Sequence, residues 1–383
     1  MNMIFQIKQI IITAVLLMIG FSSMAQENPQ KEVESQTIKI GEINALSGIV
    51  SVSRYNHNAM VQFAFDEINA QGGVLGKKLE LVRIDNQSSA IGSKQAAKKA
   101  VEMGVVAVLG PDFSSHALGA APVLQQAKIP MLSYGATNPK VTLVGDYIFR
   151  ACFIDPFQGK VMAYYAANDL KAKTAVILTN VGEAYSIDLA KFFRDHFERY
   201  GGKILWEGDY SASATDFKEQ LRTTKGLNPD VIFVPGYPRD SGFIMKQARI
   251  MGIKAPFLGG DGWNANTYNY GGNAIDGNYF STHWHREDPS EISRIFLKRF
   301  ENEQVRVENS PIPYDVVHLV ADAIKRANST NPEKIRDALA QTKDFPGVAG
   351  NITFDQNGDP INKPAAIVKF HKGEIKYVKT IRP

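Results

Sequence analysis

The sequence predicts an α/β fold with two lobes, each built around a parallel β-sheet. Strand and helix patterns alternate for about 250 residues from Thr37 onward, as is typical of parallel strands joined by crossover helices. The alternation breaks near Cys152 and then repeats, which indicates two lobes. From Ser290 the order changes to consecutive helical patterns followed by short strands. The later part of the chain therefore departs from the simple alternation.

The first run of elements opens with a strand of alternating apolar residues. Met60, Ala64 and Ile68 then lie four apart on one helical face, and Gly72-Gly73 ends that helix. Pro122 lies inside a later helical pattern and should kink or restart it. In this run the predicted strands are 37–44, 78–85, 105–109, 131–133 and 147–150, and the predicted helices are 58–70, 89–103 and 114–127.

The second run starts at Asp155-Pro156, where a capping carboxylate and a proline at the first helical position are typical of a helix start. Asn357-Gly358 is a hairpin signal between strand patterns. Here the predicted strands are 174–179, 203–210, 231–235, 257–259, 351–354, 365–371 and 374–380, and the predicted helices are 157–169, 183–200, 217–224, 239–251, 290–303, 314–327 and 332–340.

Composition excludes several classes of protein. With 383 residues the chain is long enough for two or three domains with their own cores. Apolar residues make up 44% and charged residues 21%, so the chain is neither disordered nor fibrous. A net charge of +4 is too weak to indicate nucleic-acid binding. The single cysteine, Cys152, excludes an internal disulfide and a multi-cysteine metal site.

Residues 1–25 are predicted to be a signal peptide. Lys8 precedes the apolar run from Ile10 to Gly20, and small residues at Ser23 and Ala25 predict cleavage after Ala25. The alternative is a membrane anchor, but the run is shorter than the roughly 20 apolar residues that a span needs. Residues 26–36 are polar without periodicity and are predicted to be a flexible leader. The mature protein is therefore expected in the periplasm.

The familiar enzyme and metal motifs are missing or incomplete. Gly72–Lys77 has the wrong spacing for a phosphate loop and precedes a strand, and the sequence holds neither a dinucleotide-binding glycine motif nor a nucleophile elbow. His283 and His285 could be two ligands on one strand face, but no third cluster accompanies them. The acidic stretch at 355–359 lacks the spacing of a calcium loop. A metal, a cofactor or catalysis is thus not expected.

Polar loops at predicted strand ends are the better candidates for a site, because parallel sheets bind ligands at the carboxyl ends of their strands. Ser114 and Ser115 open a helix, where they could receive an anion, although Ser114 could equally be only the helix cap. Thr137 lies in a second strand-end loop. Asp261 lies between two glycines next to Trp263, which indicates either a binding carboxylate or a plain turn.

A family resemblance rests on eight blocks of sequence in the same order: IKIGEINALSG, FAFDEINAQGG, LGPDFSS, YGATNP, FRACFIDPFQG, VGEAYSIDLA, PGYPRDSGFIMKQARIMGI and LGGDGWN. From Thr37 onward the chain resembles the type I periplasmic binding proteins, above all the branched-chain amino-acid receptors of ABC transporters. The resemblance implies two Rossmann-like lobes joined by three crossing strands, with lobes at 37–151 plus 284–343 and at 152–283 plus 344–383. It also implies a monomer that closes on its ligand and docks on a membrane permease.

The same resemblance implies a set of binding residues. Ser114, followed by Ser115, takes the place of the serine that binds the ligand's carboxylate. Asp261 takes the place of the acidic residue that pairs with the ligand's ammonium. The remaining implied ligand-binding residues are Gly135, Ala136, Thr137, Tyr185 and Tyr237, and the possible pocket walls are Ser53, Tyr55, Phe113, Tyr134 and Trp263.

These residues together suit an α-amino acid, since both of its charges find a partner. Aromatic walls favour a branched-chain or other aliphatic side chain. The sequence therefore predicts a receptor that delivers a small amino acid to a permease. The alternative is a sensory binding protein of the same fold for an amide, an aromatic acid or another small polar ligand.

Overall fold

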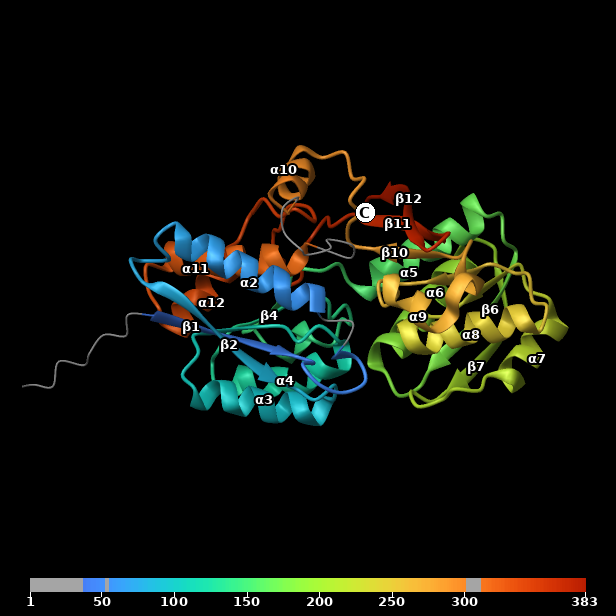
Figure 1. The fold of residues 1–383 in the computed structure, drawn as a ribbon, viewed down its shortest axis with the longest axis horizontal. Coiled ribbons are helices and arrows are strands. Elements are labelled where there is room, and N and C mark those ends of the chain that lie inside the picture. The colour runs from blue at the N-terminus through green and yellow to red at the C-terminus, as the bar shows by residue number, and fades with distance from the viewer. Residues whose placement is uncertain (1–36, 52–54, 301–310) are drawn as a thin grey trace, which may run out of the picture. The chain divides into compact units, whose positions relative to one another are not determined.

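The computed structural model describes residues 37–51, 55–300 and 311–383. The predicted signal peptide, the leader, Ser53 and the end of the helix predicted at 290–303 lie outside these residues. Two β-sheets organise the described chain (Figure 1). Their strands are β1 (Thr37–Asn44), β2 (Lys78–Asp85), β3 (Ala107–Leu109), β4 (Met131–Ser133), β5 (Ile148–Arg150), β6 (Thr174–Asn180), β7 (Lys203–Tyr210), β8 (Val231–Phe233), β9 (Phe257–Gly259), β10 (Tyr279–Thr282), β11 (Ala365–His371) and β12 (Glu374–Ile381).

The first sheet has the strand order β2-β1-β3-β4-β5, and all of its neighbouring strands are parallel. Helices α2 (Tyr55–Ala70), α11 (Ile312–Ala327) and α12 (Pro332–Ala340) cover one face with a shared apolar core. Helices α3 (Ala90–Glu102) and α4 (Ser114–Gln126) cover the other face. Figure 1 shows these two helix layers on either side of the sheet. The carboxyl ends of its strands point to one edge, where α4 begins.

The second sheet has the order β12-β11-β10-β9-β8-β6-β7. Its strands from β10 to β7 are parallel, but β11 pairs antiparallel with β10 and β12 pairs antiparallel with β11, so this sheet is mixed rather than wholly parallel. One face packs on α5 (Asp155–Tyr164) and α6 (Ala184–Arg199). The other packs on α7 (Lys218–Leu227) and α8 (Pro238–Ile250). The two sheets with their helices confirm the predicted α/β fold of two lobes.

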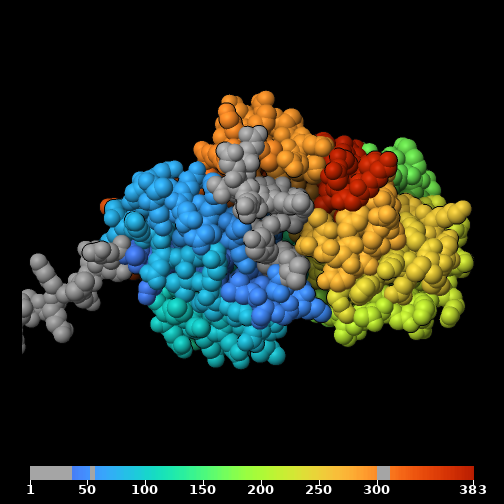
Figure 2. Space-filling model, in the orientation of Figure 1, coloured from blue at the N-terminus to red at the C-terminus, as the bar shows by residue number. Residues whose placement is uncertain are grey.

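Short helices complete the second lobe: a π-helix over Tyr165–Asp169, 3₁₀ turns over Ala265–Thr267 and Gly272–Ile275, and α9 (Tyr268–Gly271). A further 3₁₀ turn, Thr142–Val144, lies in the first lobe. Helix α10 (Glu291–Phe300) follows β10. Figure 2 shows the C-terminal residues, in red, against the yellow-orange segment around α9. There the Tyr268 hydroxyl donates to the carbonyl of Glu374 over 3.3 Å.

Several local predictions were wrong. Asp155 does not cap α5, because Ile154 is the N-cap and Asp155 already lies in the first turn. Helix α4 continues through Pro122, so the alternative of a restart there was wrong, and the kink stays a prediction. Residues 351–354 form only isolated bridges, Phe345 with Ile352 and Phe354 with Pro360, so Asn357-Gly358 closes a turn and does not join two strands.

The tight hairpin of this region lies elsewhere, between β11 and β12. Lys372 and Gly373 both have positive φ angles there, of 50° and 83°. Two consecutive positive φ angles suit the two-residue turns that match the twist of paired strands. Strand β10 was absent from the sequence-based prediction altogether.

The packing also indicates where the chain passes between the lobes. Cys152 packs with the first sheet and Phe153 with the second, and Trp284 returns to the first. Residues 345–354 still pack with the first sheet, whereas Ala365 belongs to the second. We therefore propose that the third crossing lies after Phe354 and not near Asp344.

Candidate functional site

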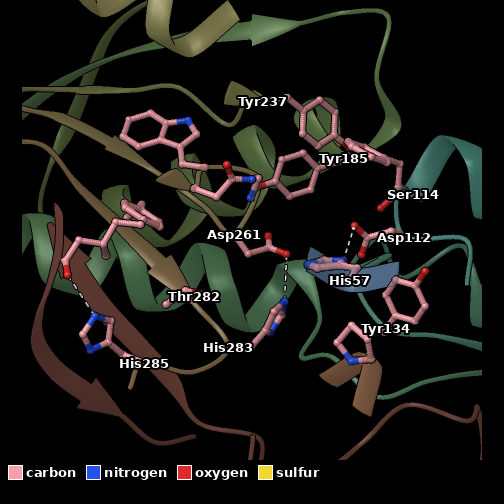
Figure 3. Close-up of a pocket in the computed structure, with 18 residues that line it drawn as sticks. His57, Asp112, Ser114, Tyr134, Tyr185, Tyr237, Asp261, Thr282, His283 and His285 are labelled. Atoms are coloured by element: carbon pink, nitrogen blue, oxygen red, sulfur yellow. Dashed lines mark hydrogen bonds and ion pairs between the residues drawn. The ribbon is translucent and has the colours of Figure 1, made fainter. Parts of the chain in front are cut away.

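A small cavity of about 60 Å³ lies where the loops at the strand ends of both sheets meet (Figure 3). Roughly 10–15 Å³ of such space holds one water molecule, so this cavity has room for a handful of non-hydrogen atoms. Eight residues singled out from the sequence line it: Phe113, Ser114, Tyr134, Gly135, Tyr185, Tyr237, Asp261 and Trp263. The structure thus brings together residues that are far apart in the sequence.

Ser114 lies at the first-lobe end of the cavity, as the first residue of α4. The N-cap is Phe113, so Ser114 is not the helix cap. Its hydroxyl oxygen accepts a hydrogen bond from the Asn138 amide over 3.2 Å, which leaves the hydroxyl proton able to donate. The first turn of a helix also carries amide groups without intrahelical partners. This end of the cavity therefore suits a carboxylate.

The loop after β4 contributes less surface than expected. Gly135 lines the cavity, but Ala136 and Thr137 are fully buried and do not. The buried guanidinium of Arg150 donates to the carbonyls of Ala136, over 2.6 Å, and Asn138, over 2.8 Å. Arg150 therefore fixes the shape of this loop from behind the cavity.

Asp261 lies at the second-lobe end and is held on both sides. Its Oδ1 accepts a hydrogen bond from the Gln158 amide over 2.8 Å, and its Oδ2 lies 3.0 Å from Nε2 of His283. Figure 3 shows the His283 ring and the Asp261 carboxylate facing each other. Two donors orient this carboxylate, and a carboxylate has about four lone-pair positions, so it can accept further bonds.

A second carboxyl group is buried behind Asp261. Burial, and secondarily the nearby charge of Asp261, raise the pKa of Asp155 well above its usual range, which favours its neutral form. The Thr137 hydroxyl lies near enough to Asp155 to lower the pKa of its carboxyl group. Nevertheless, the Thr137 hydroxyl and both carboxyl oxygens of Asp155 lack a hydrogen-bond partner of normal geometry among the described residues. The Oε1 atom of Gln158 also has none. Buried polar atoms without partners are uncommon, so this region can take up donors.

Aromatic rings cover the cavity. Tyr185 and Tyr237 stack with their ring centres 5.3 Å apart, and Phe113 of the first lobe meets Tyr237 edge-on at 4.5 Å. The Tyr185 hydroxyl accepts a hydrogen bond from the Gly262 amide. Burial raises the pKa of both tyrosines well above their usual range, so they remain neutral. The indole N–H of Trp263 donates to Ser241, so only its ring serves the cavity.

Ser115 does not line the cavity. Its hydroxyl donates to the Glu183 carboxylate over 2.8 Å and accepts from the Ala184 amide over 3.1 Å, both in the second lobe. The Asn138 side-chain amide also crosses the interface and donates to the Ala184 carbonyl and to Asp188. Ser115 therefore joins the two lobes in a closed arrangement.

Tyr55, one of the predicted pocket walls, is described by its backbone, which begins α2.

Four polar residues of the cavity were not predicted from the sequence: His57, Asp112, Asn264 and Thr282. Asp112 follows β3 directly, in the same loop as the two serines. His283, which was considered only as a metal ligand, also lines the cavity, directly after β10. His285, considered as a metal partner of His283, points its Nε2 at the carbonyl of Ile375, 3.2 Å away. The described residues contain no group of three or more potential metal ligands.

Comparisons with known proteins agree with this geometry. A family model described as "Periplasmic binding protein" matches residues 37–374. The leucine-, isoleucine-, valine-, threonine- and alanine-binding protein of Pseudomonas aeruginosa is 27% identical over 362 residues, which cover 94% of this chain and 95% of that protein. Within the described part of the chain, no helix has both the length and the apolar character needed to cross a membrane.

Two solved structures share the whole fold. A leucine binding protein, LivK, from Thermotoga maritima has a TM-score of 0.86 at 33% identity, covering 90% of this chain and 99% of its own. LivJ, a branched-chain amino acid transporter substrate binding protein from Streptococcus pneumoniae, is in complex with isoleucine. Its TM-score is 0.85 at 34% identity, covering 91% of this chain and 100% of its own.

Proposed function

The chain belongs to the periplasmic binding protein family, and on this basis we propose that it captures a small α-amino acid between its lobes for an ABC transporter permease. Membership of the family confirms the resemblance drawn from the sequence blocks. The relatives are substrate-binding proteins, so the chain is a solute-binding protein and not an enzyme. The amino acid, the permease and export through the predicted signal peptide are the parts that we propose.

One observation carries the proposal: Ser114 and Asp261 line the same small cavity from opposite lobes. The carboxylate of an amino acid meets a hydroxyl donor and free amides at the start of α4. Its ammonium meets an oriented carboxylate at the other end. Buried charges are tolerated only when they are paired and hydrogen-bonded, and here each charge of the ligand has its counterpart.

Asp261 supports an ammonium in particular. An ammonium group carries three N–H donors, and the Asp261 carboxylate, oriented by Gln158 and His283, can accept from it. A ligand with only a carboxylate would bring no cation to Asp261 in the closed cavity, so the deaminated analogue should bind more weakly.

The cavity also limits the size of the ligand. Its volume of about 60 Å³ in the closed arrangement suits a small solute and excludes a peptide. The relatives named above bind leucine, isoleucine and related amino acids according to their names, which supports the same size class.

The test is calorimetric titration of the mature chain with alanine, valine and leucine, each next to its deaminated and its decarboxylated analogue. We expect binding of an amino acid and loss of binding for both analogues. The Ser114→Ala variant should bind about 10-fold more weakly, since the helix amides still hold the carboxylate. Equal binding of the deaminated analogue, or no binding of any amino acid, would refute the proposal.

The transport role is tested separately by deleting the gene and measuring amino-acid uptake. Delivery to a permease predicts that uptake falls and is restored by the wild-type gene but not by the Asp261→Ala variant. Unchanged uptake together with a lost regulatory response would instead indicate the sensory alternative.

A further inference from the structure

A buried ion pair ties the third crossing to the first lobe. Arg150, the last residue of β5, is fully buried, and its Nε donates to Oδ1 of Asp359 over 2.6 Å. Asp359 lies beyond Phe354, where we place the third crossing. The Thr142 hydroxyl completes the group, because it accepts from Nη2 of Arg150 over 2.7 Å and donates to the same oxygen of Asp359 over 2.9 Å. We call these three residues, Arg150, Asp359 and Thr142, the Arg150 cluster.

The acidic stretch at 355–359 is shaped to bring Asp359 to this place. Gly358 has a positive φ angle of 81°, and a side chain there would run into the carbonyl of Ile148. The carbonyl of Gly358 accepts a hydrogen bond from the Arg150 amide over 3.1 Å. The stretch therefore packs directly on β5, which is an outer strand of the first sheet.

The remaining donors of the guanidinium hold the loop after β4. Its Nη1 donates to the carbonyls of Ala136 and Asn138, and its Nη2 donates to the carbonyl of Pro139 over 3.3 Å. The guanidinium is planar and rigid, so its orientation fixes three carbonyl groups of one short loop at once. Gly135 in the same loop lines the cavity. The groups that orient Arg150 therefore also set the position of this loop.

Asn138 connects the loop to the first-lobe end of the cavity. Its carbonyl is held by Arg150, and its amide donates to the hydroxyl oxygen of Ser114 over 3.2 Å. A hydroxyl oxygen that accepts from one direction has its proton available for another, so this amide orients the donor that would meet the ligand. Ser114 lines the cavity, whereas the residues of the Arg150 cluster are not among the described residues that line it.

Resting on the proposed function, we propose that Asp359 and Thr142 are positioning residues for the carboxylate of the ligand. They orient Arg150, which holds the carbonyl of Asn138, and the amide of Asn138 orients the hydroxyl of Ser114. The third crossing thereby contributes to ligand affinity from outside the cavity. A cluster with a purely structural role would change stability without changing what Ser114 contributes to binding.

Thr142→Val tests the inference because it removes one hydroxyl and leaves the ion pair of Arg150 with Asp359 in place. Calorimetry with alanine, valine and leucine should show at least 5-fold weaker binding than in the mature wild-type chain, for each of these probes that the wild type binds. Thr142→Ser keeps the hydroxyl and should restore affinity to within 2-fold. If Thr142→Val does not fold, Asp359→Asn replaces it with the same expected loss. The control for this second variant is Asp337→Asn on the exposed face of α12.

Thr342 provides a matched control for Thr142 in the same lobe. Its hydroxyl accepts from Nη2 of Arg326 over 3.0 Å, and Arg326 pairs with Asp322 over 2.7 Å, so the same three residue types meet here. Thr342 is not among the described residues that line the cavity. Thr342→Val should leave the affinity for the probes unchanged, even where it lowers thermal stability. A loss of less than 5-fold in Thr142→Val, or an equal loss in Thr342→Val, would overturn the inference.

The path through Ser114 is tested by combining two variants. In the Ser114→Ala background the hydroxyl is already absent, so the loss of affinity caused by Thr142→Val should be at least 2-fold smaller than in the wild type. Any lesser reduction would also overturn the inference. Failure of the proposed function has a different signature, since the wild type itself would then bind none of the three probes.

Discussion

The hydroxyl of Ser115 in the first lobe donates a 2.8 Å hydrogen bond to the carboxylate of Glu183 in the second. Burial raises the pKa of Glu183 above its usual range, against the opposing effect of this hydrogen bond. The same hydroxyl accepts from the Ala184 amide at the start of α6, so one side chain serves two partners across the interface. Because the contact joins the two lobes and lies outside the cavity, we expect it to form on closure and to stabilise the bound form without touching the ligand.

Ser115→Ala should therefore weaken ligand binding through closure alone. We expect a loss of about 1 kcal/mol, the usual worth of one hydrogen bond. A double-mutant cycle with Glu183→Gln, read by calorimetry, should give a coupling of 0.5 kcal/mol or more, on the order expected for contacting residues. Fully additive effects would show that the two residues do not act as a pair in solution.

Asp261→Asn should lower affinity without unfolding the protein. The ammonium of the ligand would lose its charged partner, at a cost of about 2–5 kcal/mol. The asparagine keeps the shape of the side chain and can still accept from Gln158, so thermal stability should change little. Calorimetry of this variant next to Asp337→Asn measures the effect, and near wild-type affinity would exclude Asp261 from the site.

His283→Gln tests whether the histidine positions Asp261. Nε2 of His283 lies 3.0 Å from Oδ2 of Asp261, and Phe153 packs on the ring with a centroid separation of 3.9 Å. Loss of the correctly placed donor should cost about 1.5–3 kcal/mol of affinity. The penalty should disappear in the Asp261→Asn background, because the residue it orients is then already lost. If His283→Gln weakens binding equally in the wild-type protein and in the Asp261→Asn variant, His283 contacts the ligand directly.

Glu42 predicts a pH dependence of stability. It lies directly opposite Arg83 in the β1–β2 ladder, with its Oε2 accepting from Nε over 3.0 Å. Burial raises its pKa from 4.5 to about 7 in spite of Arg83. A raised carboxyl pKa means that the folded state holds the proton more tightly than the unfolded one. The stability that the protonated Glu42 contributes is therefore fully present below pH 4.5 and is lost as the pH rises through about 7.

The Glu42→Gln variant should lack this loss. The rise of the Glu42 pKa from 4.5 to about 7 corresponds to roughly 3 kcal/mol of unfolding free energy. Urea unfolding should therefore show that the wild type loses about that much more stability than the variant between pH 4.5 and pH 8. Parallel pH profiles for the two proteins would contradict the assignment.

The sequence predicted elements best where periodicity was strong. Strands Thr37–Asn44, Lys78–Asp85 and Lys203–Tyr210 have the predicted bounds, because their apolar pattern alone specifies them. Residues 351–354 carry a similar short apolar pattern but only isolated bridges, since pairing depends on which neighbour tertiary packing supplies. Strand β10 was not predicted, although the similarly short β4 and β9 were predicted with the bounds that the structure shows.

Most of the predicted site residues that lie next to recognisable strand ends line the cavity, whereas Ser115 has its partners in the other lobe. Ser114 and Ser115 are neighbours with the same hydroxyl, yet one faces the cavity and the other faces Glu183. Consecutive residues of a helix point in different directions, so the two hydroxyl groups at the start of α4 have different neighbours. The sequence alone does not show which residues those neighbours are. His57 lies on α2, and only the packing of α2 against the first sheet brings it to Asp112.

The placement of β11 and β12 has a consequence for the order of synthesis. β11 pairs with β10, but the chain first adds α10, α11 and α12, of which α11 supplies much of the apolar core of the first lobe. During translation β10 stays an open sheet edge and the first lobe lacks part of its core, so neither half can mature early. Folding of both lobes must therefore wait until nearly the whole chain has left the ribosome, in keeping with the export that we propose.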